Sequence, residues 1–192
     1  MKFKLGKIDF FISFLSLTIY FTAAFFDRSG LFPLYIAALF IHESGHLAAL
    51  LFKKEKLRSV KIMTFGVELA YNKTSCTYLK NALICLGGPA FNIICFGIFY
   101  RINNVFALIN LIFALYNLLP VGSVDGGMAL ENLLLSRISP DKVKIICGFV
   151  SVVFLIPFLT LLLFICIREL NITAAVLGIY LVWNLLKKYE IS

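Results

Sequence analysis

Residues 31–52 read LFPLYIAALFIHESGHLAALLF, an apolar run that contains both histidines of the chain. A run of this length is enough for an α-helix to cross the hydrocarbon core of a bilayer. His42 and His46 are four residues apart, so on a helix both imidazoles lie on one face, with Glu43 beside them. This spacing of two histidines and a glutamate predicts a Zn²⁺ site on a membrane helix.

The competing interpretation is a helix that carries two unconnected histidines. The apolar surroundings weigh against it, because buried polar side chains in hydrocarbon cost several kcal/mol unless they have partners. Ionisable residues inside a membrane segment therefore indicate a functional site by default. We expect His42, Glu43 and His46 to act together.

The composition indicates an integral membrane protein. The chain is 61% hydrophobic and 15% charged, with a mean hydropathy of +0.95, whereas an ordinary soluble chain carries about 25% charged residues. The 192 residues allow about six spans and leave no room for a second folded domain. A single polytopic membrane domain is predicted over residues 1–192, with six apolar runs at 8–26, 31–52, 79–100, 102–119, 145–167 and 172–186.

Two details refine the predicted spans. The first run follows a basic N-terminus, but no convincing cleavage site follows it, so it is predicted to be a retained helix rather than a signal peptide. Ser139, Pro140 and Asp141 are typical of a helix start and are predicted to begin the fifth span. Pro157 is predicted to kink that span.

The basic residues predict the orientation of the chain. If the N-terminus is inside, all of the 18 Lys and Arg residues fall in the cytoplasm except Arg28, Arg101 and Arg168. This bias predicts a multi-pass protein of the cell membrane with both termini cytoplasmic. The net charge of +8 is expected to face anionic lipid, and no nucleic-acid partner is predicted.

A catalytic zinc ion usually takes three protein ligands, and the chain has no third histidine. His46 precedes Lys53 by seven residues, so it should lie about 10 Å below the cytoplasmic charge boundary. The carboxylates that remain possible at this depth are those of Glu68, Asp125 and Glu131.

Asp125 is the favoured third ligand because of the segment that contains it. Residues 117–127 read NLLPVGSVDGG, and Pro120, Gly122, Gly126 and Gly127 are predicted to break a helix there. Non-helical backbone at membrane depth is tolerated only when it is buried in protein or lines a wet cavity. An ordinary turn is the alternative, since Asp-Gly-Gly is common in turns.

Three segments together resemble a known family. In order, HESGH at 42–46, GPAFN at 88–92 and NLLPVGSVDGG at 117–127 resemble the site-2 protease family of intramembrane zinc metalloproteases, most closely the bacterial branch typified by the stage IV sporulation protein FB. The resemblance implies that His42, His46 and Asp125 hold one zinc ion per chain and that Glu43 is the catalytic base. It also implies that Asn92 and Asn117 shape the site or the path of the substrate.

The expected fold is an all-α membrane protein of about six transmembrane helices. The chain departs from other branches of the family, since it has no room for an inserted PDZ domain and stops soon after its last span, so no C-terminal regulatory domain is expected. Residues 59–71 read as short strands around Gly66, and in the family this region is a membrane-associated β-hairpin whose edge could pair with an extended substrate. A surface loop rich in β-branched residues is the alternative. The expected partners are lipid and a membrane protein substrate, and a regulatory membrane protein is a further candidate.

The function that follows is cleavage of membrane-embedded or membrane-tethered proteins. One alternative is a membrane metal carrier or transporter, which should show polar residues stepping across the bilayer or paired repeats, and neither is seen in the sequence. Another is a catalytically silent homologue that only binds substrates. Such a homologue should lack Glu43 or a ligand, and none is lost.

Overall fold

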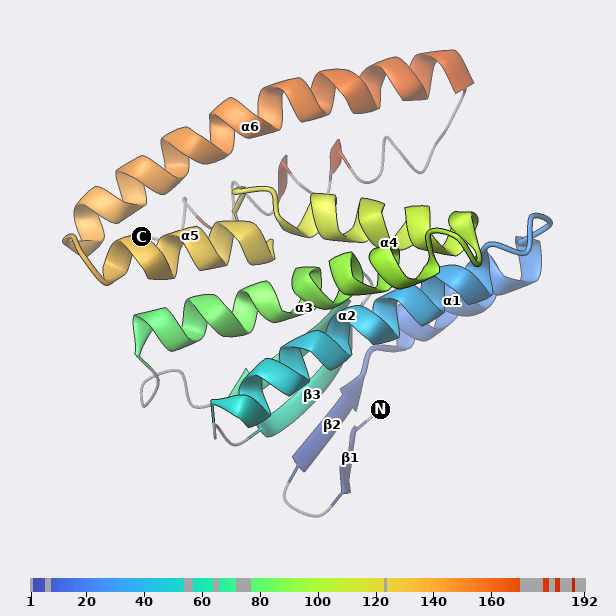
Figure 1. Cartoon of the computed structure of the whole chain (residues 1–192), viewed down its shortest axis with the longest axis horizontal. Helices are drawn as coiled ribbons and strands as arrows, with labels where there is room; N and C mark the ends of the chain where they lie inside the picture. The colour runs from blue at the N-terminus through green and yellow to red at the C-terminus, as the bar shows by residue number, and fades with distance from the viewer. Residues whose placement is uncertain are drawn as a thin grey trace. The chain divides into compact units, whose positions relative to one another are not determined.

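The computed structural model describes residues 2–5, 8–53, 57–63, 66–71, 77–122 and 124–169, together with 178, 179, 182, 183 and 188 (Figure 1). The chain divides into two compact units, Met1–Tyr116 and Asn117–Ser192. The single protease domain over residues 1–192 stays a prediction.

The first unit combines helices with a sheet. Its helices are α1 (Phe14–Phe26), α2 (Phe32–Phe52), α3 (Tyr78–Phe99) and α4 (Asn104–Asn117), the last of which reaches the unit boundary. Pro33 lies in the first turn of α2, where its missing N–H costs nothing. The Thr77 side chain accepts a hydrogen bond from the Lys80 N–H and caps α3.

Helices α2 and α3 run side by side (Figure 1) and approach each other closely at two glycines. A Cβ on Gly45 would lie 2.2 Å from the Gly87 carbonyl oxygen, and a Cβ on Gly87 would lie 2.6 Å from the Gly45 carbonyl oxygen. Small residues at both positions therefore let the two backbones touch. Elsewhere along these helices, Ala38 of α2 and Cys95 of α3 form a buried cluster with Phe106 of α4.

The described part of the chain is mostly helical, as predicted, and it also contains four strands. They are β1 (Lys2–Leu5), β2 (Ile8–Ile12), β3 (Leu57–Met63) and β4 (Gly66–Tyr71). They form one sheet in the order β1-β2-β3-β4, in which only the β2-β3 pair is parallel. A parallel pair needs a crossover connection, and here α1 and α2 provide it.

The β3-β4 hairpin lies where strands were predicted, whereas β1 and β2 were not foreseen. The predicted first span, 8–26, was wrong at its start, because Ile8–Ile12 form a strand and the helix begins only at Phe14. A short apolar run rich in Ile and Phe fits a buried strand as well as a helix, and periodicity alone does not separate the two. The membrane contact of the hairpin stays a prediction.

The hairpin is fixed to the helices at one end of α2 and α3. Leu50 and Ile84 form a buried pair that packs against Leu57 of β3 and Tyr71 of β4. The Tyr71 hydroxyl also donates a hydrogen bond to the Asn81 side-chain oxygen at 3.2 Å. These contacts place the sheet next to the turn of α3 that contains Ile84.

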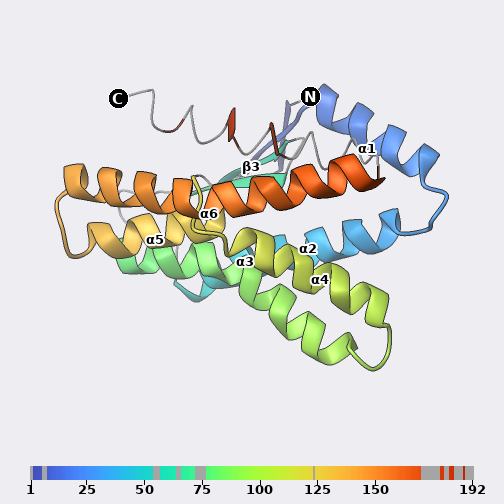
Figure 2. The same cartoon turned by 90° about the horizontal axis from the view of Figure 1, so that it is seen from above.

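The second unit contains α5 (Asp125–Leu135) and α6 (Pro140–Glu169), which run side by side (Figure 2). Helix α6 begins at Pro140 as predicted, and the Val143 N–H closes its first turn on the Ser139 carbonyl. Helix α5 was not predicted, because its 11 residues are less apolar than a span. The predicted sixth span, 172–186, lies almost entirely outside the described residues.

In the described part of the chain, three helices are long and apolar enough to cross a membrane. These segments are Phe32–Phe52, Tyr78–Phe99 and Pro140–Phe164. Helices α1 and α4 are apolar but shorter, and the 14 residues of α4 extend about 21 Å against a hydrocarbon core of about 30 Å. The count of six spans stays a prediction.

Candidate metal centre

The two histidines face each other on α2, as the spacing predicted. His42 is buried and His46 half-buried, and their Nε2 atoms lie 3.1 Å apart. The ring planes are nearly perpendicular, at 84°. The one-face geometry of residues four apart on a helix therefore brings two nitrogen ligands to one point.

The other ring nitrogen of each histidine contacts a hydrogen-bond acceptor. Nδ1 of His46 lies 2.8 Å from the Ile84 carbonyl oxygen, and Nδ1 of His42 lies 2.7 Å from the Asn92 Oδ1. Since a carbonyl or amide oxygen only accepts, each Nδ1 carries the hydrogen and donates it. In the neutral imidazole each Nε2 then keeps its lone pair, and this is the form that binds a metal ion.

A buried amide pair fixes the acceptor for His42. Asn92 Nδ2 donates to the Ala38 carbonyl at 3.1 Å and to Asn110 Oδ1 at 2.8 Å, while Asn110 Nδ2 donates to the Phe106 carbonyl at 2.9 Å. The two main-chain carbonyls accept only, so they orient both amides, and the Asn92 oxygen is left facing His42. Asn92 and Asn110 are 0% exposed, which makes this orientation difficult to reverse.

Gly88 of α3 lies directly against the paired nitrogens. A Cβ at this position would be 2.4 Å from His46 Nε2 and 2.8 Å from His42 Nε2. Because real Cβ contacts are never this short, no side chain fits at residue 88 while both histidines keep their positions. The glycine therefore keeps open the space beside the two nitrogens.

The nitrogen pair fits a divalent cation. Two lone pairs that face each other at 3.1 Å repel unless a proton or a cation lies between them, and both Nδ1 hydrogens are already committed to other acceptors. Two imidazole nitrogens on a tetrahedral Zn²⁺, each about 2.0–2.1 Å from the metal, are about 3.3 Å apart. The observed separation is close to this value.

Glu43 follows His42 directly on α2 and is half-buried. One residue on a helix corresponds to a rotation of about 100°, so its carboxylate stands to one side of the histidine face rather than on it. This position suits a group that acts beside a metal ion. Ser44 is exposed and its hydroxyl donates to the Phe40 carbonyl, so it faces away from the nitrogen pair.

Asp125 is the first residue of α5, where it is buried and complements the positive end of the helix dipole. Gly126 and Gly127 were predicted to break a helix, but they lie in the first turn of α5. A Cβ on Gly126 would lie 2.3 Å from the Leu118 carbonyl oxygen, and a Cβ on Gly127 would lie 2.7 Å from that of Gly122. The glycines are needed because the preceding loop packs against this turn.

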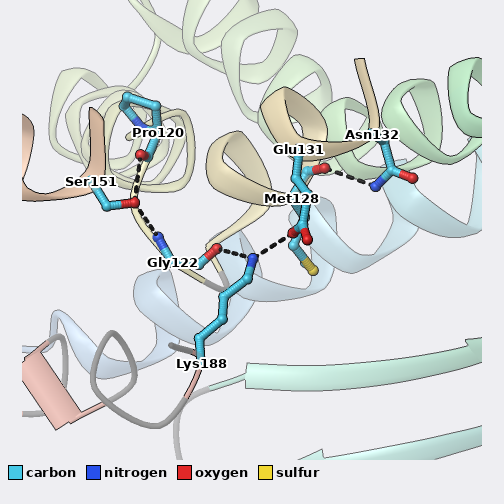
Figure 3. Close-up of polar contacts among 7 residues, drawn as sticks. All are labelled: Pro120, Gly122, Met128, Glu131, Asn132, Ser151 and Lys188. Carbon is cyan, nitrogen blue, oxygen red and sulfur yellow. Dashed lines mark hydrogen bonds and ion pairs between the residues drawn. The ribbon is translucent and has the colours of Figure 1, made fainter. Parts of the chain in front are cut away.

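Residues 118–122 and 124 are non-helical, as predicted from Pro120 and Gly122. Gly122 has a φ of 51°, in the left-handed region that favours glycine. Its N–H donates to the Ser151 hydroxyl of α6 at 3.1 Å, and that hydroxyl donates to the Pro120 carbonyl at 3.3 Å (Figure 3). Buried Ser151 thus holds the loop that leads to Asp125.

The other two acidic candidates have different surroundings. Glu131 forms an ion pair with Lys188 (Figure 3), and Glu68 lies in β4, where its backbone pairs with that of Lys61. Among the described residues, His42, His46 and Asp125 are the group of side chains that could hold a metal ion. Asn117 is the half-buried last residue of α4, and its role stays a prediction.

Sequence reasoning did not single out four residues that pack or hydrogen-bond near the candidate ligands or the loop before Asp125, namely Gly88, Asn110, Ser151 and Lys188. A signal was available for Asn110, because an amide in the middle of an apolar run is costly unless it has a buried partner. Gly88 was noted only as part of a motif. The roles of Ser151 and Lys188 depend on contacts between distant segments, which the sequence does not reveal.

The comparisons with known proteins agree with this geometry. Residues 93–158, which include Asn110 and Asp125, match the family model described as peptidase family M50. The fold is similar to that of the site-2 protease from Methanocaldococcus jannaschii. The TM-score is 0.68 at 18% identity, and the match covers 100% of this chain and 96% of that chain.

The likeness to this site-2 protease is one of fold. No curated protein matches the sequence. The M50 match begins after the HESGH segment, so the histidine pair rests on the geometry of α2 and α3 rather than on the matched residues. The expected similarity to the sporulation branch is not confirmed by these comparisons and stays a prediction.

Proposed function

We propose that this protein is an intramembrane zinc metalloendopeptidase that cleaves membrane-embedded or membrane-tethered proteins. The observation that carries the proposal is the pair of Nε2 lone pairs, 3.1 Å apart, with both Nδ1 hydrogens committed to acceptors on α3. The site-2 protease fold and the M50 match support the same reaction class.

In this proposal His42, His46 and Asp125 hold one zinc ion per chain. Two neutral imidazoles and one carboxylate form a ligand set that catalytic zinc commonly takes, with a further position left open. Bound there, zinc supplies Lewis-acid activation of a water molecule and of a peptide carbonyl. The buried acceptors on α3 keep both imidazoles in the ligating tautomer throughout the reaction.

Glu43 acts as the general base. Its carboxylate takes a proton from the attacking water and later delivers that proton to the nitrogen of the leaving amine, so the group is regenerated in each turnover. The half-buried position of Glu43 next to His42 suits this role. Asn92 is a positioning residue, since it contacts a ligand rather than a substrate.

The substrate class follows from the setting of the site. A helical substrate hides its carbonyls in its own hydrogen bonds and has to be extended before attack. The β3-β4 hairpin packs near Ile84, whose carbonyl binds His46, and its strand edge offers main-chain groups to an extended segment. With both termini in the cytoplasm, as the basic residues predict, the site would open toward that side.

The test uses purified full-length protein in detergent, with zinc content measured by mass spectrometry and cleavage followed on single-span reporter proteins. Native protein should hold one zinc ion per chain and cleave. Glu43→Gln should keep zinc and lose cleavage, whereas His46→Ala should lose both. Ser44→Ala is the matched control within the same motif and should retain both.

Two results would overturn parts of the proposal. Equal cleavage by native protein and Glu43→Gln would remove the hydrolytic role. Zinc that binds but is transported into vesicles, without cleavage of any reporter, would favour a metal carrier instead.

A further inference from the structure

We propose that Lys188 is a positioning residue for Asp125 because it braces the loop that precedes α5. The inference rests on the proposed function, in which Asp125 is a zinc ligand. Its basis is a cluster of polar contacts within the second unit (Figure 3), none of which the chemistry of the site itself requires.

Lys188 joins the loop to the helix that carries the ligand. Its Nζ donates to the Gly122 carbonyl at 2.8 Å and to the Glu131 carboxylate. Gly122 lies three residues before Asp125, and Glu131 lies six residues after it on α5. One ammonium group therefore ties the chain on both sides of Asp125, and three donors on one atom make this double contact possible.

We call the contacts of Lys188 with Gly122 and Glu131 the brace, and Gly122 is held from both of its polar main-chain groups. Its carbonyl oxygen packs against the position of Gly127 in the first turn of α5, and its N–H is held by Ser151 of α6. With Lys188 on the carbonyl, both polar groups of this left-handed residue are fixed. The direction in which the chain enters α5 is then set, and with it the direction in which the Asp125 carboxylate leaves the helix.

The environment makes the contact effective. The side chains of Lys188 and Glu131 are 22% and 35% exposed, so the ion pair is partly shielded from water and from salt. The pairing also neutralises Glu131, the other acidic side chain of α5. Glu131 thus has a structural role, whereas Asp125 is the proposed zinc ligand.

The test compares Lys188→Met with Lys142→Met, which alters an exposed lysine at the start of α6 in the same unit. Two quantities are measured on the full chain: hydrogen exchange of the amides in residues 118–124 without zinc, and zinc affinity by competition with a chelator. We expect Lys188→Met to speed exchange in this loop and to weaken zinc affinity about tenfold or more, as loss of a ligand-supporting contact does. Lys142→Met should change neither.

A third variant and the kinetics separate positioning from general stability. Lys188→Arg keeps the charge and can donate to both oxygens, so it should restore most of the zinc affinity. Cleavage by Lys188→Met should fall in kcat with KM nearly unchanged, because the substrate does not contact Lys188.

Three results would contradict different parts of the proposal. Unchanged loop exchange in Lys188→Met would overturn the brace. Faster exchange with unchanged zinc affinity would overturn the positioning role and leave a purely structural contact. Native protein that binds no zinc would refute the proposed function, while the exchange measurement would still decide whether the brace exists.

Discussion

At the scale of single residues, the histidine pair depends on groups that never touch a metal ion. His42 is set by a chain of hydrogen bonds that runs through Asn92 and Asn110 to the Phe106 carbonyl. His46 is set by one main-chain carbonyl, that of Ile84. A main-chain acceptor cannot be removed by mutation, so the His42 side of the site is the one that substitution can test.

Asn92→Leu is predicted to weaken zinc binding about 10- to 100-fold, because the buried Nδ1–H of His42 loses its acceptor and the ligating tautomer is no longer favoured. Asn110→Leu should have a smaller effect in the same direction, since Asn92 would keep its bond to Ala38. Competition with a chelator gives both affinities. Asn104→Leu, at the exposed start of α4, is the control, and equal affinities in all of these variants would show that the amide pair does not tune the site.

Gly88→Ala is predicted to abolish zinc binding while the fold survives. The new Cβ would occupy the space beside both Nε2 atoms, and if the imidazoles turn away to avoid it, their lone pairs no longer meet. Zinc content and circular dichroism would be measured together. Gly97→Ala on the same helix is the matched control, because nothing lies within 4 Å of its Cβ and helix propensity favours alanine by up to about 1 kcal/mol. Zinc retained by Gly88→Ala would contradict the geometry of the site.

At the scale of elements, the sequence was most informative where one physical signal dominated. The histidine helix and the start of α6 at Pro140 were predicted correctly, since helical spacing and the chemistry of a helix start are local. The strand at Ile8–Ile12 was missed because an apolar run has no periodicity that separates a strand from a helix. Its pairing with β3 is a long-range contact across α1 and α2.

The first turn of α5 also could not be predicted from local sequence. Gly126 and Gly127 were predicted to break a helix, yet they lie in the first turn of α5. Main-chain atoms of residues 118–122 pack against this turn and leave no room for a Cβ at either position. Intrinsic propensity is outweighed here by a close backbone approach. The candidate ligands were predictable from residue type and spacing, whereas their supports, Asn110, Ser151 and Lys188, depend on tertiary contacts.

The turn between α1 and α2 gives a prediction about pH. Asp27 accepts hydrogen bonds from the Ser29 hydroxyl at 2.6 Å and from the Phe32 N–H at 2.9 Å, and these bonds hold the pKa of its carboxyl below the ordinary value of 3.8. Because the pKa is lower in the folded state, the stabilising contribution is complete above about pH 4 and is lost as the pH falls through the folded pKa.

The native protein should therefore lose stability at the start of α2 more steeply than Asp27→Asn when the pH is lowered below about 4. Hydrogen exchange of the first-turn amides of α2 would measure this. Asp141→Asn, at the exposed start of α6, is the control for general acid effects. Identical acid profiles for native protein and Asp27→Asn would show that the turn does not depend on the carboxylate.

At the scale of the whole molecule, the proposed zinc ion would join ligands that are far apart in the sequence, two histidines of α2 and the first residue of α5. An ion held in this way binds the folded chain and not the unfolded one. It should stabilise the native protein by about 2.7 kcal/mol at a free zinc concentration of 100 times the dissociation constant.

The measurement is denaturant unfolding with zinc and with a chelator, followed by circular dichroism. The native protein should gain stability with zinc, whereas Asp125→Ala should lose most of this gain even if its stability without zinc is also lower, because the difference between the two conditions isolates the ion. Asp141→Ala alters an exposed acid of the same unit and should keep the full gain. A full gain in Asp125→Ala would mean that the third ligand of the ion is another group.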